Sequence, residues 1–466
     1  MKIKKIEFYN HKILGDFAID FSVDNVIKNI SLLVSENGCG KTTLLEEIYK
    51  ILTESFAAWE NGPNKKITFE FTEDEKNKFS LSTHILTIEY DKSKSENNMW
   101  GRFFVFDENG NDISASARSL LYNNPLTSAF KCAFSTVEIN FEKRSIESIK
   151  ATSIDSDEFV KNKSTNNIAT EISQLLVDIK NQDNAEKANL FDSGAISTEQ
   201  PYAGKFDRFK AAYSKMFNGK ELKDVITENN NYKIIFKDLK KNVEFDISDL
   251  SSGEKQIVYR AGYLLKNLRG ITSGVVLIDE PELSLHPIWQ EKYLQFIREV
   301  FLLENKNDIQ FVIATHSFLL LKDALKDGIV INIFRKDSLG QISVINARDK
   351  GFGLLKWSPS WGEICHFAYG LPTIEFHNDL YSAIEDKLKN DPSDRIAQAV
   401  FEKYIKDNAP NTPIIKWKTS SGHQKEETIM TFVRNNIHHP DNIERPKAEP
   451  DQLTKSIHYM LKLITS

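Results

Sequence analysis

The chain has 466 residues, of which 40% are hydrophobic and 27% are charged, a composition typical of a globular protein with a sizeable core. The formal net charge of -6 excludes a basic nucleic-acid coat, so contact with nucleic acid would need a local patch or a partner. Three scattered cysteines exclude a disulfide framework. Short apolar runs and an N-terminus without an apolar core exclude a membrane span and a signal peptide. We therefore expect a cytoplasmic protein without membrane contact.

Strand-like patterns dominate the first third of the chain. The strands expected there lie at 2–8, 17–21, 30–34, 67–71, 85–90, 103–106 and 137–141. Residues 42–55 instead follow the spacing of an amphipathic helix. A Ser/Asp/Lys-rich stretch at 143–165 predicts a mobile loop, and helical spacing returns at 168–179 and 204–217.

The second half of the chain alternates strands with helices. The strands expected there lie at 232–236, 243–247, 275–278 and 311–314, with helices after Ser252 and near 288–302. This alternation predicts an α/β fold with a largely parallel sheet. After about residue 350 the pattern is mainly helical, with segments at 363–389, 393–407, 426–438 and 451–464.

A phosphate-binding loop is predicted between a buried strand and an amphipathic helix. Ser35-Glu-Asn-Gly-Cys-Gly-Lys41-Thr42-Thr43 matches the P-loop pattern, except that Ser35 occupies the first glycine position. Glycines let successive N–H groups face a phosphate, and the start of the helix adds its positive dipole end. Lys41 would bridge the β- and γ-phosphates of ATP, and Thr42 would ligate Mg²⁺; alone, the motif would also fit a glycine-rich turn. The predicted nucleotide-binding residues are Asn37, Gly38, Cys39, Gly40, Lys41, Thr42 and Thr43.

Two further apolar strands end in candidate catalytic residues. The first is followed by Asp279, which would complete the Mg²⁺ shell, and by Glu280, which would polarise the attacking water. The second ends before His316, which can hydrogen-bond a γ-phosphate. Taken singly, the acids would also fit a solvated turn, and His316 would fit a hydrogen-bonded core residue.

The fourth motif is Leu250-Ser251-Ser252-Gly253-Glu254-Lys255-Gln256, immediately before a predicted helix. Alone, it would be only a good helix cap. It resembles the signature sequence of ABC-type ATPases, with Ser252 and Glu254 where that motif often has Gly and Gln. Four motifs in this order, each on the expected element, are together typical of an ABC-type ATPase head.

The resemblance implies a head-to-head dimer in which the signature of one subunit caps the ATP held by the other subunit's P-loop. Ser251 and the Gly253 N–H would then contact the γ-phosphate, Glu280 would be the catalytic base and His316 the switch residue. The glutamine of the Q-loop is not assigned, because no glutamine occurs between residues 44 and 173. Asn124 is a candidate substitute.

The predicted head is divided by a long insertion. Residues 1–55 and 230–350 form the head, and 56–229 form an α+β insertion of strands and a helical arm. The insertion is too short and too broken by strands for a long coiled coil. The sequence Asp279-Glu-Pro-Glu-Leu-Ser-Leu-His-Pro287 resembles the RecF, SMC/Rad50 and overcoming-lysogenization-defect group, whose members act on nucleic acid or control nucleases.

Residues 351–466 predict a separate, mainly helical domain. Arg434 and His439 fit the pattern Arg-x4-His and resemble the HEPN ribonuclease motif. Such a histidine can take the proton of an RNA 2′-hydroxyl while the arginine stabilises the phosphate charge. The alternatives are an inactive HEPN-like bundle and an unrelated helical interaction domain. No metal site is predicted at His438 and His439, because no acid or cysteine stands at ligand spacing.

The compact head and this polar C-terminal part together resemble the ATPases of bacterial anti-phage systems, most of all the Septu-type ATPases that also occur in retron operons. The resemblance implies a homo-oligomer built on head-to-head dimers that uses ATP and Mg²⁺ and restrains an HNH-type nuclease partner. Nucleic acid would be reached through that partner or the C-terminal domain. The alternatives are a self-contained effector with a HEPN-like ribonuclease, and a RecF/SMC-like DNA-repair ATPase.

Overall fold

The described part of the computed structural model falls into two compact units. The first comprises Met1–Val34, Gly38–Asn332 and Lys336–Val344, and the second Ser35–Asn37, Ile333–Arg335 and Ile345–Ser466. Within the described residues, no helix has the length and apolar character needed to cross a membrane. The described residues are 1–94, 102–122, 126, 130–136, 146, 148–149, 161–163, 167–194, 204–217, 219–268, 273–303, 308–326, 328–389, 391 and 393–465.

The largest sheet has seven strands in the order β10-β9-β14-β15-β5-β16-β17. Neighbouring strands from β10 to β5 pair in parallel, and β14 is buried at every residue, as a parallel sheet covered on both faces requires. The strands are β5 (Ile30–Val34), β9 (Cys132–Ser135), β10 (Lys161–Lys163), β14 (Ser273–Asp279), β15 (Asp308–Thr315), β16 (Val330–Lys336) and β17 (Ile342–Asn346). The helices that follow β5, β14 and β15 are α1 (Lys41–Thr53), α7 (Pro287–Ile297) and α8 (Phe318–Lys326).

An antiparallel sheet of five strands forms from the N-terminal part of the chain in the order β2-β1-β6-β7-β8. One face of each strand carries the alternating apolar residues and is buried. The strands are β1 (Lys2–His11), β2 (Gly15–Asp20), β6 (Asn64–Glu70), β7 (Ile85–Tyr90) and β8 (Phe103–Phe106). Smaller elements nearby in sequence are β3 (Ser22–Val23), β4 (Val26–Ile27), the 3-10 helix η1 (Phe56–Asn61), α2 (Glu73–Phe79) and α3 (Ser114–Tyr122).

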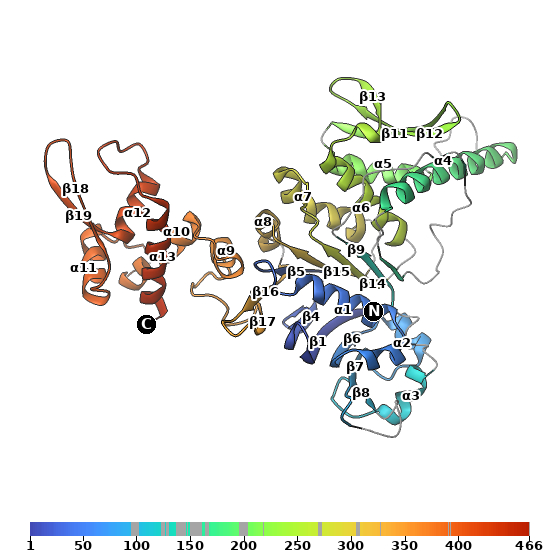
Figure 1. Cartoon of the computed structure of the whole chain (residues 1–466), viewed down its shortest axis with the longest axis horizontal. Coiled ribbons are helices and arrows are strands. Elements are labelled where there is room, and N and C mark those ends of the chain that lie inside the picture. Colours follow the sequence, from blue (N-terminus) through green and yellow to red (C-terminus); the bar gives the residue numbers. More distant parts are fainter. Residues whose placement is uncertain are drawn as a thin grey trace. The chain divides into compact units, whose positions relative to one another are not determined.

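A helical arm and a small sheet complete the first unit. Figure 1 shows α4 (Ile168–Asp192) as a long helix that reaches out past α5 (Lys205–Met216) and α6 (Ser252–Leu268). The Tyr213 hydroxyl donates to the Val258 carbonyl and ties α5 to α6 at 2.9 Å. The small sheet contains β11 (Lys220–Glu228), β12 (Asn231–Asp238) and β13 (Val243–Asp246), and the short η4 (Ile247–Asp249) follows it.

Helices make up most of the second unit. Residues from α10, α11, α12 and α13 share one apolar core in which the rings of Tyr381 and Phe401 stack 4.0 Å apart. A hairpin of β18 and β19 lies between α11 and α12 in the chain. The elements are α9 (Trp361–Tyr369), α10 (Ile374–Leu388), α11 (Gln398–Asn408), β18 (Ile414–Lys418), β19 (Gln424–Thr428), α12 (Ile429–His438) and α13 (Pro450–Thr465).

The structure confirms an α/β head with an α+β insertion and a mainly helical C-terminal part, but it corrects several predicted elements. The helix predicted at 363–389 is two helices, because Gly370 adopts the left-handed conformation (φ 64°) that ends α9. The hairpin at 414–428 was not predicted, and the helix predicted from 426 begins at Ile429. The helix predicted to end at 179 continues to Asp192. The strand predicted at 137–141 and most of the loop predicted at 143–165 lie outside the described residues.

Candidate active site

Three adjacent parallel strands bring the predicted site residues to one edge of the sheet. β15 lies between β5 and β14, with Thr315 paired to Val34 and Ala314 paired to Asp279. The loops that leave the three strands therefore start side by side at the carboxyl edge, where α/β proteins place their ligands. One carries the P-loop, one Asp279 and Glu280, and one His316.

The P-loop backbone adopts a conformation that suits phosphate binding. Gly38 (φ 78°) and Gly40 (φ 83°) lie in the left-handed region, and a Cβ at Gly40 would come 2.6 Å from Leu14 Cδ2. Ser35 does not adopt a positive φ, which explains why serine is tolerated there. Gly40, the N-cap of α1, makes no side-chain cap, so N–H groups at the start of the helix can donate to a phosphate oxygen. Asn37 is exposed and Thr43 half-buried, whereas Cys39 is a buried free thiol.

Lys41 and Thr42 begin α1 and face the acids of β14. Lys41 is 5% exposed, and burial lowers the pKa of its ammonium to about 8, against the opposing charges of Asp279 and Glu280. The Thr42 hydroxyl donates to Asp279 Oδ2 at 2.9 Å. The first turn of α1 therefore presents a cation and a hydroxyl beside a carboxylate.

Asp279 fits a magnesium ligand. It is 2% exposed, and of the described residues none hydrogen-bonds its Oδ1, which leaves that oxygen for a cation. Burial raises the pKa of this carboxyl to about 6, and the neighbouring Glu280 adds to the rise. Thr42 and Asp279 would hold Mg²⁺, which when bound neutralises the β- and γ-phosphate charge.

Glu280 and His316 lie within contact of each other. Glu280 Oε1 is 3.3 Å from His316 Nε2, and both side chains are about one-quarter exposed, at 25% and 27%. Glu280 adopts φ 43°, an uncommon backbone for a non-glycine residue and one that concentrates at functional sites. The His316 N–H donates to the buried Glu282, whose pKa is raised by burial. Glu282 belongs to the motif at 279–287, but the sequence predicted no role for it.

Arg260 is a second residue of the site that the sequence did not predict. It lies on α6, is 2% exposed and donates through Nη1 to the Asp279 carbonyl oxygen at 3.0 Å. Burial lowers the pKa of its guanidinium. Arg260 connects the helix that begins at the signature with the strand end that carries the two acids. Nothing in the sequence distinguishes Arg260 from the other cations of the predicted helix.

The signature residues form the start of α6. Glu254 Oε2 accepts from both the backbone N–H and the hydroxyl of Ser251 at 2.9 Å, and Lys220 donates to Glu254 Oε1 at 2.7 Å. These contacts lower the pKa of Glu254 against its burial. A Cβ at Gly253 would clash with the Ser284 carbonyl oxygen, so glycine is needed there. Ser252 is exposed at the first position of α6.

Asn124, the candidate for the Q-loop residue, lies outside the described residues. Among the described residues, no group of three or more His, Cys, Asp or Glu side chains could hold a metal ion.

The affinity for Mg²⁺-ATP is expected to peak between about pH 6 and about pH 8. Asp279 must be ionised to bind a cation, and its pKa is about 6, so affinity falls as the pH drops through that value. Lys41 must be protonated to pair with a phosphate, and its pKa is about 8, so affinity falls again above it. Equilibrium ATP titrations across this range check the profile. Asp279→Asn should remove the acid limb, and a flat wild-type profile would contradict the assignment.

Of the two C-terminal candidates, Arg434 packs against neighbouring side chains and His439 is exposed. The Arg434 guanidinium lies 4.7 Å from the centroid of the Tyr381 ring and 3.9 Å from Glu385 Oε1. His439 is exposed at the C-terminal end of α12. Burial lowers the pKa of His438, and the charges of Arg434 and His439 lower it further. A ribonuclease role for Arg434 and His439 stays a prediction.

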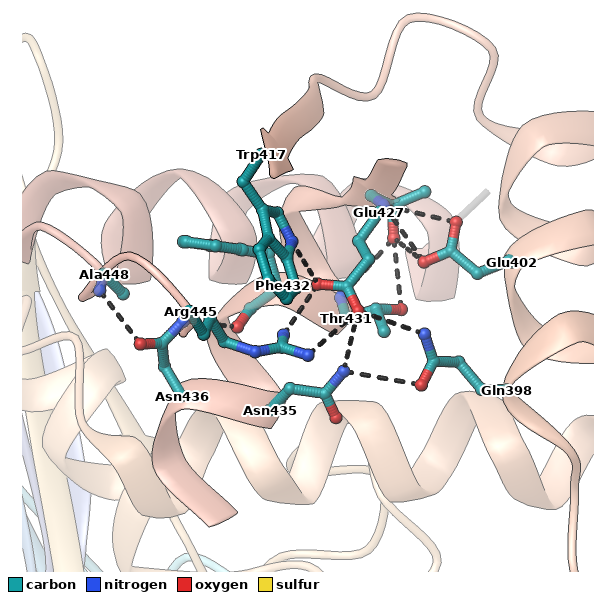
Figure 2. Close-up of polar contacts among 11 residues, drawn as sticks. Gln398, Glu402, Trp417, Glu427, Thr431, Phe432, Asn435, Asn436, Arg445 and Ala448 are labelled. Carbon is teal, nitrogen blue, oxygen red and sulfur yellow. Dashed lines mark hydrogen bonds and ion pairs between the residues drawn. The ribbon is translucent and has the colours of Figure 1, made fainter. Parts of the chain in front are cut away.

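A buried polar network next to these residues was not predicted. Figure 2 shows Glu427 of β19 surrounded by donors from four segments. Arg445 forms a paired salt bridge with it at 2.6 and 3.1 Å, and Asn435 donates to it at 3.2 Å. The Arg445 guanidinium also lies 5.1 Å from the Trp417 ring centroid. The network ties the hairpin, α12 and the loop after α12 together, which is a structural role.

Comparison with known protein families places most of the first unit in one family. The family described as "AAA domain, putative AbiEii toxin, Type IV TA system" matches residues 36–322. The chain belongs to this family, and its fold and P-loop make it an ABC-type ATPase.

The individual proteins that the chain resembles share about a quarter of its residues or less. The Retron Vc95 probable ATPase of Vibrio cholerae is 24% identical over 413 residues, which cover 76% of this chain and 75% of the relative. The Retron Ec83 probable ATPase of Escherichia coli is 25% identical, with 68% and 69% covered. Septu protein PtuA of Bacillus mycoides is 23% identical over 76% of this chain but only 43% of that protein. Among solved structures, the SMC head domain from Thermotoga maritima aligns with a TM-score of 0.40 and 15% identity, covering 74% of this chain and 99% of that one.

Proposed function

We propose that the chain hydrolyses ATP at the carboxyl edge of β5, β14 and β15. The observation that carries the proposal is the convergence of Lys41 and Thr42 with Asp279, Glu280 and His316. Lys41 and the N-terminal N–H groups of α1 bind the phosphates, while Thr42 and Asp279 hold the magnesium ion.

Glu280 accepts the proton of the attacking water in this proposal. Its contact with His316 at 3.3 Å orients the carboxylate and leaves the imidazole beside the site of the γ-phosphate. Glu282 fixes the backbone N–H of His316. Each of these groups acts by position and charge, which is how proteins catalyse phosphoryl transfer.

In this proposal, a second copy of the chain completes the binding site of the γ-phosphate. Ser251, Ser252 and Gly253 stand at the start of α6, where a helix N-terminus favours an anion. Arg260 on the same helix donates to the Asp279 carbonyl, which supports communication between the signature and the acids. The oligomer is therefore built on head-to-head dimers.

The biological role is cytoplasmic anti-phage defence in which the ATPase restrains an HNH-type nuclease until infection. The similarity to two retron probable ATPases and to PtuA supports this role. Two alternative roles, a self-acting ribonuclease and a DNA-repair ATPase, have no supporting contact among the described residues.

Co-purification with the product of the neighbouring gene tests the role. We expect a stable complex whose nuclease activity falls when ATP is added, and no such fall in a complex carrying Lys41→Ala. The exposed Lys326→Ala on α8 is the matched control. Absence of a complex, or nuclease activity indifferent to ATP, would contradict the role. RNA cleavage by the chain alone would favour the HEPN-like alternative instead.

A further inference from the structure

One pocket in the first unit is lined by none of the P-loop residues. Its volume is about 570 Å³, within the range of small-molecule sites. Its walls are the end of β1 and the turn that follows (residues 10–12), the second half of α1 with its C-cap Glu54 (47–54), and the segment 58–65, which ends in the first residues of β6. Lys92, placed after β7, closes one side.

Lys65 is the central feature of this pocket. The residue is 4% exposed, and of the described residues none forms a hydrogen bond or ion pair with its ammonium group. The ammonium lies 5.1 Å from the centroid of the Trp59 ring, and a Cβ at Gly62 would come 2.8 Å from Nζ. Burial lowers its pKa to about 8, so it stays mainly protonated near neutral pH. A buried charge without a bonded counter-ion is costly, which points to a missing anion.

Trp59 supplies a second unsatisfied donor in the same wall. Its indole Nε1 is buried and has no hydrogen-bond partner among the described residues. An anionic oxygen in the pocket is the kind of acceptor that the Lys65 ammonium lacks.

The charge of the lining also favours an anion. Its lysines are Lys12, Lys50, Lys65 and Lys92, against the two acids Glu47 and Glu54. Glu47 is already paired with Lys50 at 2.7 Å and lies 3.9 Å from His11. Burial lowers the pKa of His11, which keeps it neutral. The lining therefore has an excess of positive charge.

We propose that this pocket binds the phosphate groups of a small polyphosphate ligand, separately from the ATP held by the P-loop. A nucleotide and an inorganic polyphosphate share this chemistry, and the volume admits either. A lysine 4% exposed is too deep for the backbone of a nucleic-acid duplex to reach. Lysine ammonium groups bind phosphate as point charges, which suits a pocket lined by several of them.

The test uses the full chain with Lys41→Ala, so that the outcome does not depend on the P-loop. We expect this chain to bind tripolyphosphate in isothermal titration, and addition of Lys65→Met to weaken binding by about tenfold or more. Lys66→Met, on the next residue of β6, is the matched control and should leave binding unchanged. ATP titrated into the same chain distinguishes a nucleotide ligand from inorganic polyphosphate.

Two further measurements are tripolyphosphate binding by Gly62→Ala and the thermal unfolding midpoint of Lys65→Met. Gly62→Ala should weaken tripolyphosphate binding as well, because the added Cβ displaces the Lys65 ammonium. Lys65→Met should raise the midpoint of thermal unfolding in phosphate-free buffer, since it removes a buried charge that the acids Glu47 and Glu54 only partly offset. The proposal is overturned if the Lys41→Ala chain binds no tripolyphosphate, if Lys65→Met leaves binding unchanged, or if it lowers that midpoint. A Lys65→Met variant that loses ATP binding but still binds tripolyphosphate would also overturn the proposal. The pocket would then hold the nucleoside of the nucleotide bound at the P-loop.

Discussion

Replacement of Lys41 with alanine is expected to weaken ATP binding by about 10²-fold or more, because it removes a buried ammonium that pairs with phosphate oxygens. The uncharged side chain also leaves Asp279 and Glu280 without the nearby cation that offsets their charge. The loss should appear in equilibrium titration with a fluorescent ATP analogue.

The control for Lys41→Ala is Lys326→Ala, an exposed lysine of the same unit. The control should bind ATP as the wild type does, and both variants should unfold at temperatures close to that of the wild type. ATP affinity within about twofold of wild type in Lys41→Ala would contradict the placement of the phosphates at the start of α1.

Replacement of Glu280 with glutamine is expected to slow hydrolysis by about 10²–10⁴-fold while ATP still binds, because the amide cannot accept the proton of the attacking water. The geometry of the contact with His316 is preserved, since glutamine has the same shape. Steady-state phosphate release and ATP titration measure the two quantities separately. Bound ATP should persist and stabilise the head-to-head dimer.

The matched control for Glu280→Gln is Glu291→Gln, an exposed acid on α7. It should leave turnover unchanged. Normal hydrolysis by Glu280→Gln would show that another group acts as the base, and Glu282 would then be a candidate carboxylate on the same loop.

The sequence was most informative where strands end in polar motifs. The runs at 275–278 and 311–314 are apolar at every position because their strands are buried on both faces. The carboxyl ends of parallel neighbours meet at one edge, so Asp279, Glu280 and His316 could be expected near Lys41 without a structure. The structure confirms that fold, whereas the catalytic roles of these residues stay predictions.

Other residues could not be predicted because their environment depends on tertiary packing. Arg260 and Lys65 read as ordinary surface cations, and only the fold buries them. The hairpin at 414–428 was missed because its outward residues are mostly charged and only Trp417 and the end of β19 are buried. Glu427 and Arg445 are eighteen residues apart in sequence and meet only because the hairpin folds back onto α12.

In the proposed mechanism, the signature of one copy completes the ATP site that the P-loop and acids of another copy form. The most direct measurement compares ATP affinity and turnover for Ser251→Arg with those of the wild type. We predict that Ser251→Arg binds ATP with wild-type affinity but loses turnover, because the bulky side chain blocks the approach of the second copy. Wild-type turnover by Ser251→Arg would contradict the claim.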